Sequence, residues 1–133
     1  MMPEPLRPAF PASDLSPMGE MDPDRFARLL HIAGPQNRTE LLTRLAQDLA
    51  QVRDRLSVAG PAVDWADLRA QTHVLIALAG ATGAVRLQYQ AEDLNKAAHD
   101  RRRGPVAHLV PPILAGIDRL IAHARQHLEG PAA

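Results

Sequence analysis

The stretch LLTRLAQDLAQVRDRL, residues 41–56, decides the fold. Apolar side chains recur in it every three or four positions, which is the spacing of one face of an α-helix. They are Leu41, Leu42, Leu45, Leu49, Val52 and Leu56. Most positions between them are polar or charged, so the pattern predicts an amphipathic helix over about 36–58. Gly60-Pro61 is expected to break it.

The segment before this helix predicts a shorter one. Asp22 is a good N-cap residue, and Pro23 after it suits the first helical position. Apolar residues at helical spacing follow: Phe26, Leu29, Leu30 and Ile32. Gly34-Pro35 ends the pattern, so a short amphipathic helix should precede the long one.

Three more helices are predicted after residue 60. The first opens at Asp64 and ends or bends at Gly80 or Gly83, with Trp65, Leu68, Thr72, Leu75 and Ala79 on its inward stripe. The second runs over about 84–100, with Ala84, Leu87, Ala91, Leu94 and Ala98 inward. The break at 101–105 precedes a last helix over about 106–128, whose stripe is Ile113, Leu114, Ile117, Leu120, Ile121 and Leu128. Within it, Pro111-Pro112 must delay the start of the helix or kink it.

Short connections between long amphipathic helices imply antiparallel neighbours. We therefore expect an all-α protein, an antiparallel four-helix bundle with a short extra N-terminal helix. Residues 1–20 contain five of the twelve prolines and have no apolar period, which predicts a Pro-rich disordered tail. The bundle domain should then cover residues 21–130, and a monomer is expected because four helices can close the bundle.

Composition excludes several functional classes. The chain has 15 basic and 15 acidic residues and no net charge, which argues against a nucleic-acid binder. It has no cysteine, so disulfides, thiolate metal sites and cysteine nucleophiles are excluded. No apolar stretch approaches the roughly 20 residues of a membrane span, and the N-terminus does not resemble a signal peptide. We expect a cytoplasmic protein with no membrane partner.

His73 is the candidate reactive residue. It lies two positions from Leu75, about 200° away on a helical wheel and so off the inward stripe. Its neighbours one turn away include Arg69, Ile76 and Ala77, and Gly80 follows two turns on. An imidazole is a good nucleophile near pH 7. The small and apolar residues around this one would let a partner's backbone approach.

Residues 73–87 resemble the family of histidine-containing phosphotransfer (HPt) domains. The family pattern is H-x-L-K-G-x-A-x-x-x-G-A-x-x-L, and this chain matches it in register at His73, Leu75, Ala79, Gly83, Ala84 and Leu87. The resemblance extends over about residues 21–128, beginning with MDPDRFARLL. It implies that His73 relays phosphoryl groups between receiver domains of a two-component phosphorelay. The expected partners are response-regulator receiver domains or a hybrid histidine kinase.

Two positions depart from the family pattern. Ile76 stands where the family has a lysine that steadies the phosphoryl group, and Ala77 replaces the following glycine. An exposed ion pair contributes under about 1 kcal/mol, so its loss should slow transfer rather than prevent it. The alternative is a degenerate member, a non-catalytic module whose Ile76, Ala77 and Gly80 face holds a receiver or a partner helix.

The resemblance also implies where the metal ion and the helper groups for phosphotransfer come from. The receiver would supply Mg²⁺, so this chain needs no cofactor of its own. The antiparallel neighbouring helix should pass His73 near residues 90–99, which makes Asn95 and His99 candidate helpers, with Arg69 as a third.

The other histidines are interpreted without a function. His123 and His127, spaced i and i+4, could hold a metal ion, but no third ligand is evident. They are predicted to be surface residues near a helix C-terminus, where the helix dipole favours a cation. No metal site is predicted.

Overall fold

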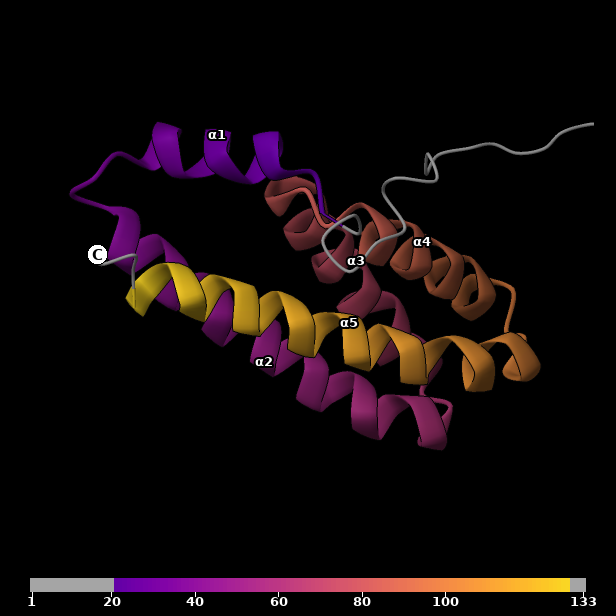
Figure 1. The fold of residues 1–133 in the computed structure, drawn as a ribbon. Helices are drawn as coiled ribbons and strands as arrows, with labels where there is room; N and C mark the ends of the chain where they lie inside the picture. The colour runs from indigo at the N-terminus through magenta and orange to yellow at the C-terminus, as the bar shows by residue number, and fades with distance from the viewer. Residues whose placement is uncertain (1–20, 130–133) are drawn as a thin grey trace, which may run out of the picture.

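A computed structural model describes residues 21–129 as an all-α protein, with no strand in that range (Figure 1). Its helices are α1 (Pro23–Ala33), α2 (Arg38–Ala62), α3 (Trp65–Thr82), α4 (Val85–His99) and α5 (Arg103–Glu129). The four long helices α2–α5 pack as a bundle, and the short α1 lies across one end of it. The predicted fold class is therefore confirmed. The predicted tail, residues 1–20, lies outside the described residues.

The bundle forms because each helix contributes one apolar stripe to a shared core. Helix α2 packs against α3 and α5, and α4 packs against the same two helices on the other side. The inward stripe predicted for α4 is buried in full: Ala84, Leu87, Ala91, Leu94 and Ala98. On α2, five of the six predicted apolar positions are buried, and Leu41 is half-buried. The core runs the length of the four helices, so their outer faces remain for function.

Helix α1 begins as predicted. The Asp22 carboxylate accepts hydrogen bonds from the backbone N–H groups of Asp24 and Arg25, at 3.1 and 3.2 Å, and so caps the helix. Phe26 is the buried anchor of α1. Ile32, predicted as part of the apolar face, is instead 75% exposed, because it lies in the last turn beyond the core.

Helix α2 does not stop before Gly60-Pro61, so the predicted break is wrong. It continues to Ala62, with Pro61 exposed in its last turn. Gly60 is buried where α5 comes close. A Cβ atom there would lie 3.2 Å from a methyl group of Val110. The glycine is thus explained by the close packing of α2 on α5 rather than by a turn.

Helix α5 also differs from the prediction. It starts at Arg103, so Gly104 and Pro105 belong to its first turn, and Pro111-Pro112 do not delay it. Both of these prolines are exposed. A proline at position i leaves the carbonyl of residue i−4 without its helical partner. Here those carbonyls belong to the exposed residues Ala107 and His108, where water can hydrogen-bond to them.

By length and composition alone, residues Arg103–Leu128 of α5 could cross a membrane, contrary to the expectation that the sequence contains no such stretch. The central helix of a bundle meets the same criterion. The apolar stripe of α5 packs against α2 and α4, and its opposite side carries exposed charged residues such as Asp118 and Arg125. Packing in the core accounts for the apolar stripe of this helix, which is 39% of the apolar window.

Ion pairs join α2 to its two neighbours. Arg53 on α2 donates two hydrogen bonds to the Asp118 carboxylate on α5, and Arg55 donates two to Asp67 on α3. The hydrogen bonds from Arg55 hold the pKa of Asp67 below its ordinary value. Both pairs lie at the surface, where such pairs contribute less than about 1 kcal/mol each. They fix the register of the helices more than they stabilise the fold.

Candidate functional site

His73 lies in the middle of α3 and its side chain is exposed. The helix begins at Asp64, whose carboxylate accepts a hydrogen bond from the backbone N–H of Asp67 at 3.1 Å. Leu68, Thr72 and Leu75 turn inward and are fully buried. His73 therefore lies on the opposite side of α3, where a partner can reach the imidazole. The backbone around it is regular helix.

The surface around His73 is almost entirely aliphatic and small. We define the α3 outer face as the exposed residues of this helix: Ala66, Ala70, His73, Val74, Ala77 and Ala81. Outer faces of bundle helices are normally charged or polar, as α4 shows with exposed Glu92, Asp93 and Lys96. On the α3 outer face, His73 is the single group able to form hydrogen bonds or accept a phosphoryl group through its side chain.

Sequence reasoning found His73, Ala77 and their neighbours but not the full extent of this face. The signal was present, because residues 70–82 include no Asp, Glu, Lys or Arg. A helix that is apolar on every side is normally buried. In α3, however, only one side is buried against the bundle. The small apolar residues that do not face the bundle therefore lie on the surface of the protein.

A buried polar contact fixes α3 against α4 directly beside His73. The Asn95 side-chain amide on α4 donates a hydrogen bond to the Thr72 hydroxyl oxygen at 2.8 Å. The Thr72 hydroxyl in turn donates to the Leu68 carbonyl oxygen, also at 2.8 Å. Asn95 thus contacts the residue before His73 from α4, in the region predicted for a helper. One of its amide hydrogens is already used to position Thr72.

Arg69 is the cation nearest to His73 along α3. It lies one helical turn before the histidine, a spacing that brings side chains together on one face. The residue is half-buried. Within residues 21–129 its guanidinium has no hydrogen bond or ion pair, whereas Lys96 on α4 pairs with Asp100. Arg69 therefore has all its donors available for an anionic group at His73.

The remaining predicted site residues differ in their exposure and in their position relative to His73. Ala77 is exposed and Ile76 is half-buried on the side of α3 that faces α4. Gly80 is partly covered, because a Cβ there would lie 3.6 Å from the Gln88 side chain. His99 is exposed in the last turn of α4. It is one turn beyond Asn95 and therefore further from His73 than Asn95 is.

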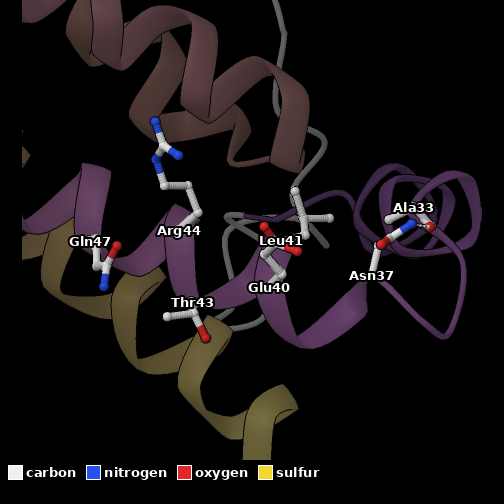
Figure 2. Close-up of a pocket in the computed structure, with 7 residues that line it drawn as sticks. All are labelled: Ala33, Asn37, Glu40, Leu41, Thr43, Arg44 and Gln47. Carbon is white, nitrogen blue, oxygen red and sulfur yellow. Dashed lines mark hydrogen bonds between the residues drawn. The ribbon is translucent and has the colours of Figure 1, made fainter.

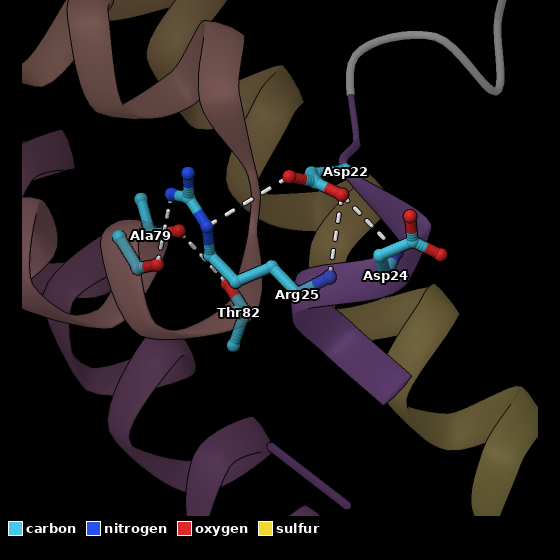
Figure 3. A network of polar contacts seen from close by, with 6 residues as sticks. Asp22, Asp24, Arg25, Ala79 and Thr82 are labelled. Carbon is cyan, nitrogen blue, oxygen red and sulfur yellow. Dashed lines mark hydrogen bonds and ion pairs between the residues drawn. The ribbon is translucent and has the colours of Figure 1, made fainter. Parts of the chain in front are cut away.

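Helix α1 is attached to the C-terminal end of α3 by polar contacts (Figure 3). The Arg25 guanidinium donates to the Gly80 carbonyl oxygen at 3.2 Å, and the Asp22 backbone N–H donates to the Gly83 carbonyl oxygen at 2.6 Å. Gly83 has a φ of +80°, and a Cβ there would lie 2.6 Å from the Asp22 carbonyl oxygen. The close approach of α1 and the left-handed turn thus give Gly83 a structural reason, independent of phosphotransfer.

A cavity of about 600 Å³ lies along the first half of α2, away from His73. Figure 2 shows its lining residues: Ala33, Asn37, Glu40, Leu41, Thr43, Arg44 and Gln47. Arg44 pairs with Asp48 at 3.3 Å, and Asn37 donates to the Ala33 carbonyl oxygen. The polar lining is exposed apart from these contacts and offers no nucleophile or acid–base pair, so this cavity does not compete with His73 as a reactive site.

The two histidines near the end of α5 are not simple surface residues, which corrects the prediction. His123 and His127 are both half-buried, and their rings lie 4.7 Å apart. Phe26 of α1 packs against both, at 4.7 and 4.8 Å between ring centroids. Burial, together with the neighbouring His127, lowers the pKa of His123. Among residues 21–129, no cluster of three or more histidine or acidic side chains could hold a metal ion.

We compared the chain with protein-family models, with curated proteins and with solved structures, and found no match in any of the three comparisons.

Proposed function

We propose that this protein is a histidine phosphotransfer protein in which His73 carries the phosphoryl group between receiver domains. The observation that carries the proposal is the α3 outer face. A single exposed histidine stands in mid-helix among alanines and one valine, on a rigid bundle. A flat, small-residue surface admits the backbone of a partner close to the imidazole. Fixed geometry at the nucleophile lowers the entropic cost of in-line transfer.

The reaction exchanges one bond for another. The unprotonated ring nitrogen of His73 attacks phosphorus while the bond from phosphorus to the receiver's aspartyl oxygen breaks. The aspartate leaves as a carboxylate, and the other ring nitrogen releases its proton to water. The reverse steps pass the group to the next receiver. Charge on the transferring group must be compensated, and the partner receiver is the expected source of Mg²⁺.

Arg69 is the residue of this chain best placed to share that compensation. It is one turn from His73 and has no partner in residues 21–129. A guanidinium can donate two parallel hydrogen bonds to phosphate oxygens. In the HPt family pattern, a lysine three residues after the histidine supplies the positive charge, and this chain has Ile76 at that position. Arg69 would supply it from the preceding turn instead.

The second candidate function is a non-catalytic module that binds a receiver or a partner helix through the same face. Ile76 and the aliphatic character of the α3 outer face favour it, since they supply apolar contact area and no charge. Partner surfaces of this kind depend on apolar burial rather than on reaction at the imidazole.

One experiment separates the two functions. The purified protein is incubated with phosphorylated receiver domains, and His73→Gln and His31→Gln are compared with the wild type. His31 is an exposed histidine of α1 and serves as the matched control. Phosphotransfer predicts acid-labile phosphate on the wild type and on His31→Gln, and none on His73→Gln. Binding of a receiver without any label would favour the second candidate function.

A further inference from the structure

A cavity of about 420 Å³ lies where α1, the start of α2 and the end of α5 meet. Three of its lining residues are basic, namely Arg38, His123 and His127, and none is acidic. The others, which include Phe26 and Leu30, are apolar. The volume is in the range typical of small-molecule sites, about 300–1,000 Å³. The site is separate from His73, and nothing in the proposed phosphotransfer uses it.

Arg38 supplies a permanent positive charge to the lining of the cavity. It is half-buried, and its Nη2 donates a long hydrogen bond of 3.5 Å to the His127 carbonyl oxygen. It has no ion pair with any side chain among residues 21–128. Most of the donors of its guanidinium fork therefore remain unused beside the cavity. A half-buried cation in this state favours an anion from outside.

The imidazoles of His123 and His127 line the cavity together with that cation. His127 Nδ1 lies 3.1 Å from the His123 carbonyl oxygen. A carbonyl oxygen only accepts, so this hydrogen bond forms when Nδ1 carries a proton. Burial and the neighbouring His127 lower the pKa of His123. The permanent positive charge in the lining is therefore that of Arg38.

We propose that this cavity binds a small organic monocarboxylate, with the carboxylate on the Arg38 guanidinium and the apolar body against Phe26 and Leu30. One fixed positive charge matches one carboxylate, whereas a phosphate dianion would be only half compensated. The planar guanidinium fits the two carboxylate oxygens. The apolar lining requires an organic body, and Arg38 repels a metal ion at the two histidines.

The site should bind more tightly as the pH falls from 8 to 6. The titratable groups facing it are Arg38 from α2 and His123 and His127 from α5, and α1 contributes no titratable lining residue. A bound carboxylate favours the imidazolium form of His123, whose pKa burial lowers in the empty site. Binding is then accompanied by proton uptake, and the affinity rises several-fold on acidification.

The test is a titration of the full chain with benzoate and hexanoate, followed by amide NMR shifts and calorimetry. The variants are Arg38→Gln and, as the matched control, Arg44→Gln, an exposed arginine of α2 that lines the other cavity. We expect shifts in α1, at the start of α2 and at the end of α5. Affinity should fall about tenfold in Arg38→Gln and stay unchanged in Arg44→Gln.

Three results would overturn the proposal. The first is the absence of any shift with either carboxylate at millimolar concentration in the wild type. The second is equal affinity for benzamide, the neutral isostere of benzoate, and the third is tighter binding of inorganic phosphate than of benzoate. Arg38→Lys keeps the positive charge but lacks the planar guanidinium group. An intermediate affinity in this variant would show that the weaker binding of Arg38→Gln comes from the lost charge and not from misfolding.

Discussion

The side-chain amide of Asn95 on α4 donates a 2.8 Å hydrogen bond to the hydroxyl of Thr72 on α3, one residue before His73. Thr72 is fully buried, so this bond satisfies a polar group inside the core. It also fixes how far α3 can rotate or slide on α4. The orientation of His73 therefore depends on a contact that a partner does not touch.

Thr72→Val should lower the free energy of unfolding by about 1–3 kcal/mol, because it leaves the Asn95 amide without its buried partner. Urea denaturation followed by circular dichroism measures the change. Thr43→Val, at an exposed threonine of α2, is the matched control and should change stability by no more than about 0.5 kcal/mol. Equal effects at the two positions would show that the contact does not stabilise the bundle.

Arg69→Gln should slow phosphorylation of His73, or shorten the lifetime of the phosphohistidine, by a few-fold. A half-exposed charge contributes on the order of 1 kcal/mol to such a contact, about a fivefold change in rate. Transfer of label from a phosphorylated receiver measures it. Arg125→Gln, an exposed arginine of α5, controls for the loss of one positive charge. The same rate in all three proteins would exclude Arg69 as a helper.

Ala77→Glu should abolish binding of a receiver while leaving the fold intact. The residue is exposed one turn from His73, so the larger charged side chain would block the approach of a partner without entering the core. Stability should change by no more than about 0.5 kcal/mol. Ala107→Glu places the same side chain on an exposed position of α5 and should bind normally. Undiminished binding by Ala77→Glu would show that the receiver docks on a different surface.

Acidification should destabilise the protein through His123. Its pKa is lowered in the folded state, so the unfolded chain binds a proton more readily. Stability is therefore fully present above the ordinary histidine pKa, about 6.5, and is lost as the pH falls through that value toward the folded one. His123→Gln should flatten this dependence in urea unfolding between pH 8 and pH 5. His108→Gln, at an exposed histidine of α5, should retain it.

Gly83→Ala should be among the most destabilising of small substitutions here. The positive φ is strained for alanine, and the added methyl would meet the Asp22 carbonyl oxygen. A cost above about 1 kcal/mol is expected. Gly104→Ala is the control, because nothing lies within 4 Å of its Cβ position and alanine favours a helix. In thermal unfolding, the Tm should fall in Gly83→Ala and rise in Gly104→Ala.

Periodicity was sufficient to predict the number, order and inward faces of the helices, because a bundle buries one stripe of each helix. It failed at Gly60-Pro61 and at Gly104-Pro105, where residues that usually break helices lie in a terminal turn or at a close helix contact. Local residue preference cannot reveal such a contact, since Val110 is distant in sequence.

The candidate site was predictable in part. The position of His73 off the inward stripe follows from the helical repeat, and its exposure agrees with that expectation. The lack of a partner for Arg69 among residues 21–128 and the hydrogen bond between Asn95 and Thr72 depend on side-chain placement in three dimensions. The packing of His123 and His127 against Phe26 depends on where α1 crosses the bundle, which no spacing in the sequence encodes.

The ion pair between Arg53 and Asp118 bears on the order in which the molecule folds. These residues are 65 positions apart, so α2 and α5 meet by closing a long loop, whereas α3 and α4 are joined by a turn and can pair at once. Closing a loop costs more entropy as it lengthens. The α3–α4 hairpin that presents His73 should then assemble early, and the seam between α2 and α5 should close last.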